Sequence, residues 1–385
     1  MPKNFYRDDY THPGAEMACA MRVRMTEIKA PRYPVVDIHN HLSHVTPGED
    51  RTDLGRLLEA MDAAGIRVLI NLDGFWGEHL EKALAKYYEP YPDRFVMFGS
   101  INLAEIDRPD FKGRIQESIK EMHRRGLKGI KVFKDLSLSY RDANGKAVCP
   151  SIPPFGNPDS EYLRTFKPHG TGEPIFPDDD RLRPVWEQAA ELGLPVLIHI
   201  ADLYSFFQPF DESNEQYALI KARPDWNFHD KDVPGFEELL EAQLRLLARN
   251  PDTNFIIAHV GSYSENLKWV ADMLDAYPNA FVDIAARVGM LGRQPYTARQ
   301  FFLDYQDRIV FGSDRFPCPN EPYLPWSALS TMYRFLETFD EYFPSDSPRM
   351  APWRLYGIGL PDPVLRKIYH RNAERLIPGV SVRQP

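Results

Sequence analysis

The sequence predicts an α/β fold, and within that class a (β/α)8 TIM barrel, because two patterns alternate regularly along it. Short apolar runs rich in β-branched residues have the length and composition of buried parallel strands. They cover residues 35–39, 68–72, 95–101, 129–133, 195–199, 254–259, 280–284 and 308–312. Eight such strands, each followed by a crossover helix, close most naturally into a barrel.

Helix-like segments lie between these runs. Apolar residues recur at helical spacing in 54–64, 79–88, 111–125, 183–192, 236–248, 264–277 and 297–305. Several of these segments are followed by residues that stop a helix, namely Gly65, Pro92, Gly126, Gly193, Pro251 and Pro278. A doubly wound open sheet is the alternative fold, but no Gly-x-Gly-x-x-Gly turn follows the first strand to support it.

The chain of 385 residues is organised as one domain with extensions. We expect residues 1–33 to form an N-terminal extension and residues 34–385 a single barrel domain with a C-terminal helical extension. Prolines concentrate in 149–184 and 316–363, and an aromatic-rich stretch covers 201–234. The sequence therefore predicts long loops after strands 4, 5 and 8, at the end of the barrel where such folds build their sites.

Composition and charge exclude several classes of protein. With 43% hydrophobic and 26% charged residues, the chain is typical of a globular protein with a large core. A net charge of −9 disfavours nucleic acid and anionic lipid as partners, and no apolar run approaches the ~20 residues that span a bilayer. Cys19, Cys149 and Cys318 form no CxxC pair, which favours a reducing compartment. We expect a cytoplasmic protein with a small-molecule substrate. The sequence does not decide whether the chain forms a homo-oligomer.

Histidines and one aspartate fall at the ends of the predicted strands. His39 and His41 end the first strand, where the two-residue step of an extended chain turns both imidazoles to one face. His199 ends the fifth strand, and Asp314 follows the eighth, which neighbours the first in a closed barrel. Three imidazoles and one carboxylate around a gap suit one divalent metal ion. Zinc is the expected metal, with manganese, iron or cobalt as alternatives.

Four motifs, in their order along the chain, resemble the metal-dependent amidohydrolase superfamily, in particular its amidohydrolase-related branch of decarboxylases and lactonases. They are Asp37-Ile38-His39-Asn40-His41, Leu197-Ile198-His199, Ala258-His259-Val260-Gly261 and Phe311-Gly312-Ser313-Asp314. The resemblance implies a TIM barrel in which His39, His41, His199 and Asp314 hold a catalytic divalent metal. It also implies that His259 contacts the substrate or a bound water.

Cationic side chains border the predicted metal site. Arg287 follows the seventh strand and Arg315 follows Asp314. Because guanidinium groups match carboxylates, we expect an anionic substrate that Arg287 contacts. Lys134, nearer the carboxyl edge of strand four than Lys131, is expected to bind a substrate carboxylate or to form a salt bridge. The resemblance leaves one alternative, a carboxylated lysine that supports a second metal.

Two aromatic residues, Trp76 and Tyr204, are expected to contact the substrate. Tyr204 belongs to an aromatic group in the loop after strand five, together with Phe206, Phe207 and Phe210. We expect this group to cover the pocket or to pack on a partner subunit. A satellite core under the loop is the alternative. Polar candidates at the rim of the pocket are Asp73, Asn102 and Asp202.

Three functions are compatible with these residues. The leading hypothesis is hydrolysis of a small carboxylated or cyclic ester or amide by a metal-activated water, with Asp314 as general base and His259 helping to polarise the scissile carbonyl. The second is non-oxidative decarboxylation of a carboxylated aromatic or related acid, with Asp314 protonating carbon. The third is a catalytically silent barrel that acts as a binding module. The complete set of metal ligands argues against the silent barrel. The same residues could serve hydrolysis and decarboxylation, so they do not separate these two reactions.

Overall fold

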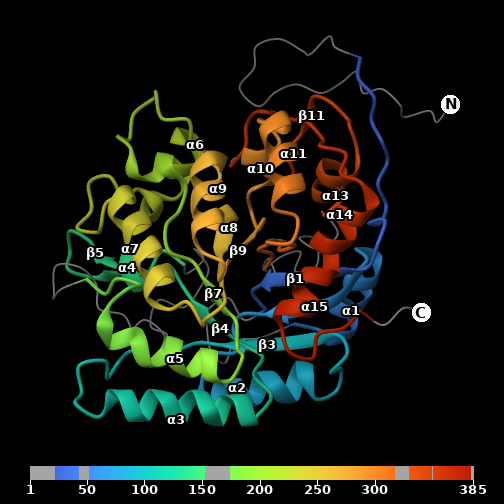
Figure 1. The fold of residues 1–385 in the computed structure, drawn as a ribbon. Coiled ribbons are helices and arrows are strands. Elements are labelled where there is room, and N and C mark those ends of the chain that lie inside the picture. Colours follow the sequence, from blue (N-terminus) through green and yellow to red (C-terminus); the bar gives the residue numbers. More distant parts are fainter. Residues whose placement is uncertain (1–21, 43–51, 152–173, 317–328, 349, 383–385) are drawn as a thin grey trace.

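The computed structural model describes residues 22–42, 52–151, 174–316, 329–348 and 350–382. At its centre lies a barrel of parallel strands in the order β1-β2-β3-β4-β7-β8-β9-β10 (Figure 1). The strands are β1 Val35–Asn40, β2 Ile66–Asn71, β3 Phe95–Gly99, β4 Gly129–Val132, β7 Val196–Ile198, β8 Phe255–Ile257, β9 Ala280–Asp283 and β10 Ile309–Val310. The predicted TIM barrel is confirmed, with a strand at each predicted position.

Backbone hydrogen bonds join the first strand of the barrel to the last. The Ile38 N–H donates to the Phe311 carbonyl (3.1 Å), and the Asp314 N–H donates to the His39 carbonyl (2.8 Å). The His41 N–H donates to the Arg315 carbonyl (2.9 Å). These bonds hold the first and the last strand of the barrel side by side, and they place the end of β1 against the segment that follows β10.

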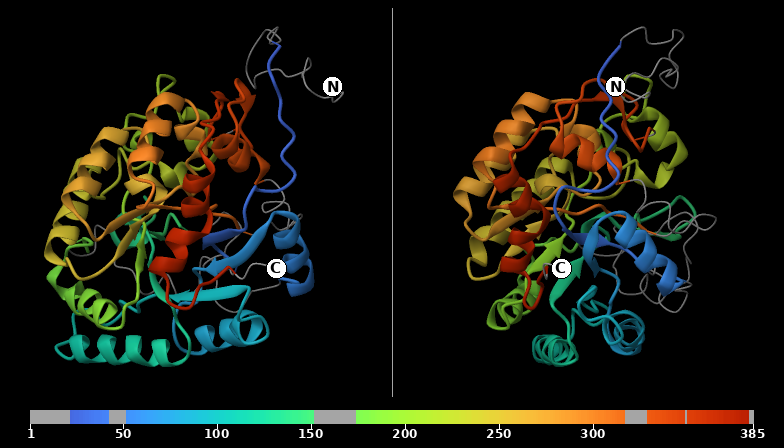
Figure 2. Two further views of the ribbon diagram at one scale, coloured as in Figure 1. Left: turned by 45° about the vertical axis from the view of Figure 1, so that its right-hand side comes forward. Right: turned by 90° about the vertical axis from the view of Figure 1, so that its right-hand side faces the viewer.

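Helices pack around the outside of the barrel (Figure 2). The crossover helices are α1 Leu54–Ala63, α2 Gly77–Ala83 with its π-helical continuation η1 Leu84–Tyr88, α3 Phe111–Arg124, α5 Arg183–Glu191, α7 Phe236–Arg249, α9 Leu267–Ala276 and α11 Pro295–Asp304. Each predicted helix is present with small shifts at its ends. For example, α9 begins at Leu267 and not at residue 264, because the Asn266 side chain accepts from the Trp269 N–H (3.1 Å) and caps the helix there.

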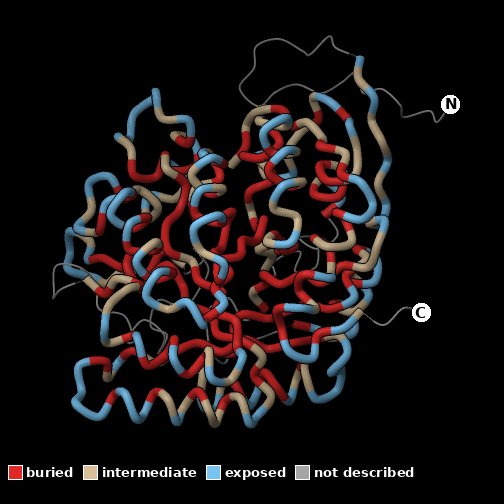
Figure 3. The backbone as a smooth tube through the Cα atoms, in the orientation of Figure 1, coloured by how far each residue is buried: buried red, intermediate tan, exposed pale blue. Residues whose placement is uncertain are grey.

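The C-terminal segment seals one end of the barrel. It contains α13 Ser330–Glu337, α14 Asp362–Arg366, η6 Lys367–Arg371 and α15 Asn372–Leu376. Ala373, Leu376, Ile377 and Val380 share one buried apolar cluster with strand residues such as Leu197, Ile256, Phe281 and Val310. The outward-facing strand residues between these, such as Ile257 and Val282, pack with the helices in a second cluster. Figure 3 shows this buried interior, which leaves the carboxyl end of the barrel for a site.

The second half of the predicted N-terminal extension lies against the C-terminal segment. Thr26 donates from its N–H and its hydroxyl to the Asp340 carboxylate, each at 2.6 Å. The Arg32 N–H donates to Glu337 (2.8 Å), and its guanidinium pairs with Asp362 (2.7 Å). Residues 1–21 of the extension, with Cys19, lie outside the described residues. Across the described residues, no helix is long and apolar enough to cross a membrane.

Long segments separate β4 from α5 and β7 from α7. Much of the loops predicted after β4 and β10 lies outside the described residues, which omit 152–173 and 317–328, and with them Cys318. The loop after β7 contains η4 Tyr204–Phe207, α6 Tyr217–Ala222 and η5 Pro224–Trp226. Phe206 and Phe207 are buried in the main hydrophobic cluster, where the Phe207 ring packs on Phe228 and Phe236. These two aromatic residues therefore extend the core, as the alternative of a satellite core expects, and neither lines the described cavity.

Close packing inside the barrel gives a prediction about stability. A Cβ built on Gly129 of β4 would lie 2.2 Å from the Phe98 ring, which is itself buried. Gly129→Ala should therefore lower the free energy of unfolding by about 1–3 kcal/mol. The control is Gly113→Ala in α3, where a Cβ meets nothing within 4 Å, and this change should raise stability by up to ~1 kcal/mol. Thermal unfolding measures both, and a Gly129→Ala protein as stable as the wild type would contradict the packing.

Candidate active site

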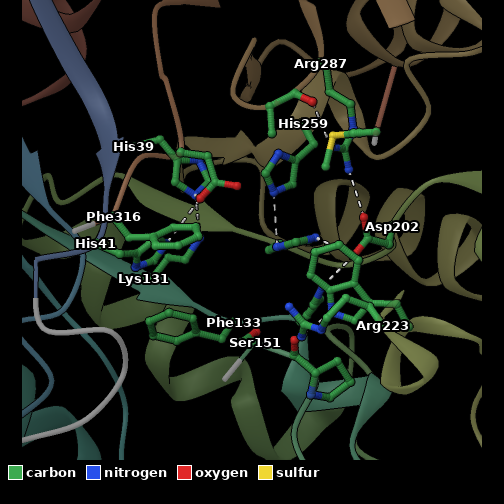
Figure 4. Close-up of a pocket in the computed structure, with 17 residues that line it drawn as sticks. His39, His41, Lys131, Phe133, Ser151, Asp202, Arg223, His259, Arg287 and Phe316 are labelled. Carbon is green, nitrogen blue, oxygen red and sulfur yellow. Dashed lines mark hydrogen bonds and ion pairs between the residues drawn. The ribbon is translucent and has the colours of Figure 1, made fainter. Parts of the chain in front are cut away.

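A cavity with about 790 Å³ of empty space, part of it continuous with solvent, opens at the carboxyl ends of the strands (Figure 4). Its described lining comprises His39, His41, Lys131, Phe133, Lys134, Pro150, Ser151, His199, Asp202, Arg223, Trp226, His259, Ala286, Arg287, Asp314, Phe316 and Met350. These residues come from the ends of β1, β4, β7, β8, β9 and β10 and from the segments after them. The cavity therefore lies where barrel folds build active sites.

His39, His41 and Asp314 form a compact group on one side of this cavity. Their ligand atoms all lie within 4.8 Å of one another. The Asp314 Oδ1 is 3.5 Å from the Nε2 of His39 and 3.6 Å from the Nε2 of His41. Asp314 has a positive φ of 58°, a conformation that costs energy in an aspartate and that the backbone bond to His39 holds in place.

Two buried carboxylates orient the histidines of this group. The Nδ1 of His39 donates to Asp283 (2.7 Å), at the end of β9. The Nδ1 of His41 donates to Asp73 (2.6 Å), just after β2. With Nδ1 occupied, each imidazole presents the lone pair of Nε2 towards Asp314, an arrangement that recurs in protein metal sites. From the sequence, Asp73 was expected at the rim of the pocket, and Asp283 was not identified as a site residue. An aspartate within an otherwise apolar predicted strand was the feature that could have identified it.

His259 and His199 form a second pair of imidazoles in the cavity. The Nδ1 of His259 donates to the Ala285 carbonyl (2.8 Å), so its Nε2 accepts from the Nδ1 of His199 (3.2 Å). The Nε2 of His199 is buried and has no hydrogen-bond partner among the described residues. A buried nitrogen with an unused lone pair is suited to a metal ion. His199 nevertheless lies outside the compact group of three.

Burial keeps these imidazoles neutral. It is the largest cause that lowers the pKa of His39 and of His199 well below the ordinary value, and it lowers the pKa of His259 to about 3. Neutral imidazole is the form that binds metals. The buried histidines are therefore held in the protonation state that a metal site requires.

Lys131, and not Lys134, is the lysine of strand four that lies against the predicted metal ligands. Its Nζ is 3.3 Å from the Nε2 of His39, and burial lowers its pKa to about 8. A cationic group thus lies beside the lone pair of His39, which indicates that this position suits positive charge. Lys134 instead donates to Asp202 at 2.5 Å. It therefore forms a salt bridge, which is one of the two roles expected for it from the sequence.

A buried ion network lies in the cavity beside His199, whose Nε2 is 3.9 Å from an Asp202 carboxylate oxygen. Asp202 accepts from Lys134 through Oδ2 and from Arg287 through Oδ1, the latter at 2.9 Å. Burial opposes ionisation of Asp202, but the two cations outweigh it and hold the pKa of the carboxyl below its usual range. Farther out, Arg223 pairs with Asp225, and its guanidinium carbon lies 4.1 Å from the centre of the Trp226 ring.

Other expected contact residues lie away from the cavity lining. Trp76 precedes α2 and packs edge-on against Phe75. Tyr204 packs on Phe236 and Tyr263, beside the aromatic cluster of its loop. Arg315 forms an ion pair with Asp346, and the Asn102 side chain accepts from the Ala104 N–H in a local turn. None of these four side chains lines the described cavity.

A sequence model described as amidohydrolase matches residues 36–379, which is most of the chain. The chain belongs to the amidohydrolase family. No curated protein matches this chain. Its fold is similar to that of a 2,6-dihydroxybenzoate decarboxylase solved with 2,6-dihydroxybenzoate, at 17% identity and a TM-score of 0.51, covering 89% of this chain and 99% of that one.

Two other solved structures have the same TM-score of 0.51 against this chain, and each match covers 89% of it. One is a dihydroxybenzoic acid decarboxylase from Polaromonas sp. JS666 with bound manganese and the inhibitor 2-nitroresorcinol, which is 15% identical over 96% of its own chain. The other is a putative amidohydrolase from Staphylococcus aureus, 16% identical over 99% of its own chain. At these identities the likeness establishes the fold alone.

The donor atoms of the compact group give a prediction about metal content. We expect the purified protein to hold about one divalent ion per chain, bound by this group and by His199 as the fourth ligand. His41→Ala should leave less than about a tenth of that metal, because it removes a ligand and leaves Asp73 without its imidazole. Elemental analysis of the folded variant measures the loss.

The matched control is His229→Ala. The His229 side chain is 38% exposed, and its Nδ1 donates to the Phe207 carbonyl, outside the cavity. Its loss should leave the metal content unchanged. His199→Ala tests the fourth expected ligand. Full metal occupancy in His41→Ala would remove the compact group as the metal site, and full occupancy in His199→Ala would remove that residue alone from the ligand set.

Proposed function

We propose that this protein is a metal-dependent hydrolase of a small carboxylated or cyclic ester or amide. The observation that carries the proposal is the group of His39, His41 and Asp314, which meets at one side of a cavity that also contains the buried ion network. A catalytically silent barrel is disfavoured, because buried neutral histidines oriented by buried carboxylates are an arrangement that a binding module does not need.

The proposed metal ligands are His39, His41, His199 and Asp314. Their chemistry fits a divalent ion such as zinc or manganese. Two of the imidazoles donate from Nδ1 to carboxylates, and the third has a buried Nε2 for which the described part of the chain provides no hydrogen-bond partner. When bound, such an ion supplies Lewis acidity, which polarises a carbonyl and favours ionisation of water.

Asp314 is the group we assign to proton transfer. Asp73 and Asp283 also border the histidines, but both are fully buried and each accepts from an imidazole. The Asp314 side chain is 26% exposed and lines the cavity, so its carboxylate can reach a water or substrate. It can accept a proton from the attacking water and return it to the leaving group.

His259 takes a different role in this proposal from the one expected from the sequence. Its Nε2 accepts from His199, and its low pKa leaves it without a proton on that nitrogen. It therefore cannot donate to a substrate carbonyl in this arrangement. We assign it to orienting His199, so that the Nε2 of His199 faces the cavity.

Decarboxylation is the second candidate function. Phe133, Trp226 and Phe316 give the cavity aromatic walls that suit a planar acid. Two solved proteins of similar fold are decarboxylases of dihydroxybenzoates, one of them with bound manganese. In this reaction Asp314 would deliver a proton to the ring carbon that loses carbon dioxide.

The general-base role is tested with Asp314→Asn, after a substrate has been found by screening lactones, N-acyl compounds and carboxylated phenols. The variant removes the proton acceptor but keeps an oxygen that can approach the metal. We expect a loss of about 10²–10⁴ in kcat, as for one positioned general base, and a much smaller loss of metal. Undiminished turnover would contradict both proposed reactions.

Isotope incorporation separates the two reactions. With wild-type enzyme in ¹⁸O-labelled water, hydrolysis must place one labelled oxygen in the product acid or alcohol, because water supplies the new bond. Decarboxylation replaces a carboxylate with a solvent hydrogen and leaves the product without the label. Mass spectrometry of the product gives the answer, and an unlabelled product that has lost carbon dioxide would overturn the hydrolase proposal in favour of the second candidate.

A further inference from the structure

Three charged residues from different strand ends meet in the cavity beside His199, whose Nε2 lies 3.9 Å from an Asp202 carboxylate oxygen. Figure 4 shows two of them, Asp202 and Arg287, on the far side of His259 from His39 and His41. Lys134 follows β4, Asp202 follows β7 and Arg287 follows β9. One carboxylate oxygen of Asp202 is 2.5 Å from the Lys134 Nζ, and the other is 2.9 Å from an Arg287 Nη. None of the three side chains is more than 7% exposed. We refer to these residues as the ion triad.

The ion triad has one positive charge more than its carboxylate balances. The other cations of the described lining are matched elsewhere, because Lys131 interacts with Asp314, Asp283 and Asp73, and Arg223 pairs with Asp225. A buried charge without a counter-ion is unfavourable, so a cavity wall with an excess cation is suited to an anion. The metal side of the cavity has the opposite balance, with three carboxylates around one lysine.

We propose that the ion triad is the receptor for one substrate carboxylate, a group that is recognised and left unchanged by the reaction. This inference rests on the hydrolase proposed above, whose substrate would have its scissile carbonyl near Asp314 and its carboxylate at Lys134 and Arg287. Asp202 pairs with both cations and offsets one of their two charges. The receptor therefore has a net charge of +1, which one substrate carboxylate balances.

Aromatic side chains next to the triad specify the shape of that substrate. The Lys134 Nζ lies 4.8 Å from the centre of the Trp226 ring, and the Trp226 indole N–H donates to the Pro150 carbonyl (3.0 Å). Arg223 stacks on the same ring while Asp225 neutralises it. This wall is rigid and adds no net charge, so it favours a flat, ring-bearing acid over a flexible one.

Binding of benzoate tests the receptor without any turnover. Calorimetric titration of the chelated, metal-free protein with benzoate should detect binding, and titration with benzamide, its neutral isostere, should not. Arg287→Met and Lys134→Met should each weaken benzoate binding by at least about tenfold, the scale of one charge-assisted hydrogen bond. Either variant suffices if circular dichroism finds the other unfolded.

Asp202→Asn distinguishes a receptor from a structural ion network. Removing the internal carboxylate leaves both cations for the ligand, so benzoate should bind more tightly, whereas loss of a structural support would weaken it. The matched control is the double variant Lys268→Met with Asp272→Asn, which removes an exposed ion pair of α9 (2.7 Å) outside the described cavity lining without changing the net charge, and it should alter affinity less than about threefold.

Two results would overturn the inference. One is benzoate binding that requires the metal, which would place the carboxylate at His39, His41 and Asp314. The other is equal binding of benzoate and benzamide, or benzoate binding that neither Arg287→Met nor Lys134→Met weakens. Because the titration uses metal-free protein and needs no reaction, its outcome is independent of whether hydrolysis itself is later demonstrated.

Discussion

The backbone hydrogen bonds between β1 and the segment after β10 are the constraint on which the candidate site depends. His39 and Asp314 are far apart in the sequence, and the bond from the Asp314 N–H to the His39 carbonyl (2.8 Å) fixes one beside the other. That bond also holds Asp314 at its positive φ, which directs the carboxylate to within 3.6 Å of both Nε2 atoms. An open sheet with the same strands would leave these ligands at opposite edges.

The fold and the position of the site follow from strand ends, which sequence patterns mark well. His39, His41, His199 and Asp314 were identifiable because each polar residue comes directly after an apolar run, and the carboxyl ends of barrel strands meet at one mouth. The side-chain pairings were not identifiable. Whether Lys131 or Lys134 faces the histidines depends on strand alternation and local twist, and the partner of Arg287 is a residue of another loop.

The loop after β7 illustrates a further limit. A run of aromatic residues in a loop is compatible with a lid, a subunit interface or a satellite core, and the choice depends on what packs beneath it. Phe206 and Phe207 contact Trp226, Phe228 and Phe236, so they are part of the core. His259 is a similar case, since its position predicted a contact with the substrate or a bound water, but its hydrogen bonds with Ala285 and His199 could not be predicted from the sequence.

The cavity has carboxylates around His39 and His41 and an excess positive charge at Lys134, Asp202 and Arg287. This separation of charge suits the proposed metal on one side and the carboxylate of the proposed substrate on the other. The most direct test of the metal side is anomalous diffraction at the manganese edge from crystals grown with manganese. We predict one peak per chain at bonding distance from the Nε2 atoms of His39 and His41 and from the Asp314 carboxylate. A peak elsewhere, with none at this group in catalytically active protein, would contradict the account.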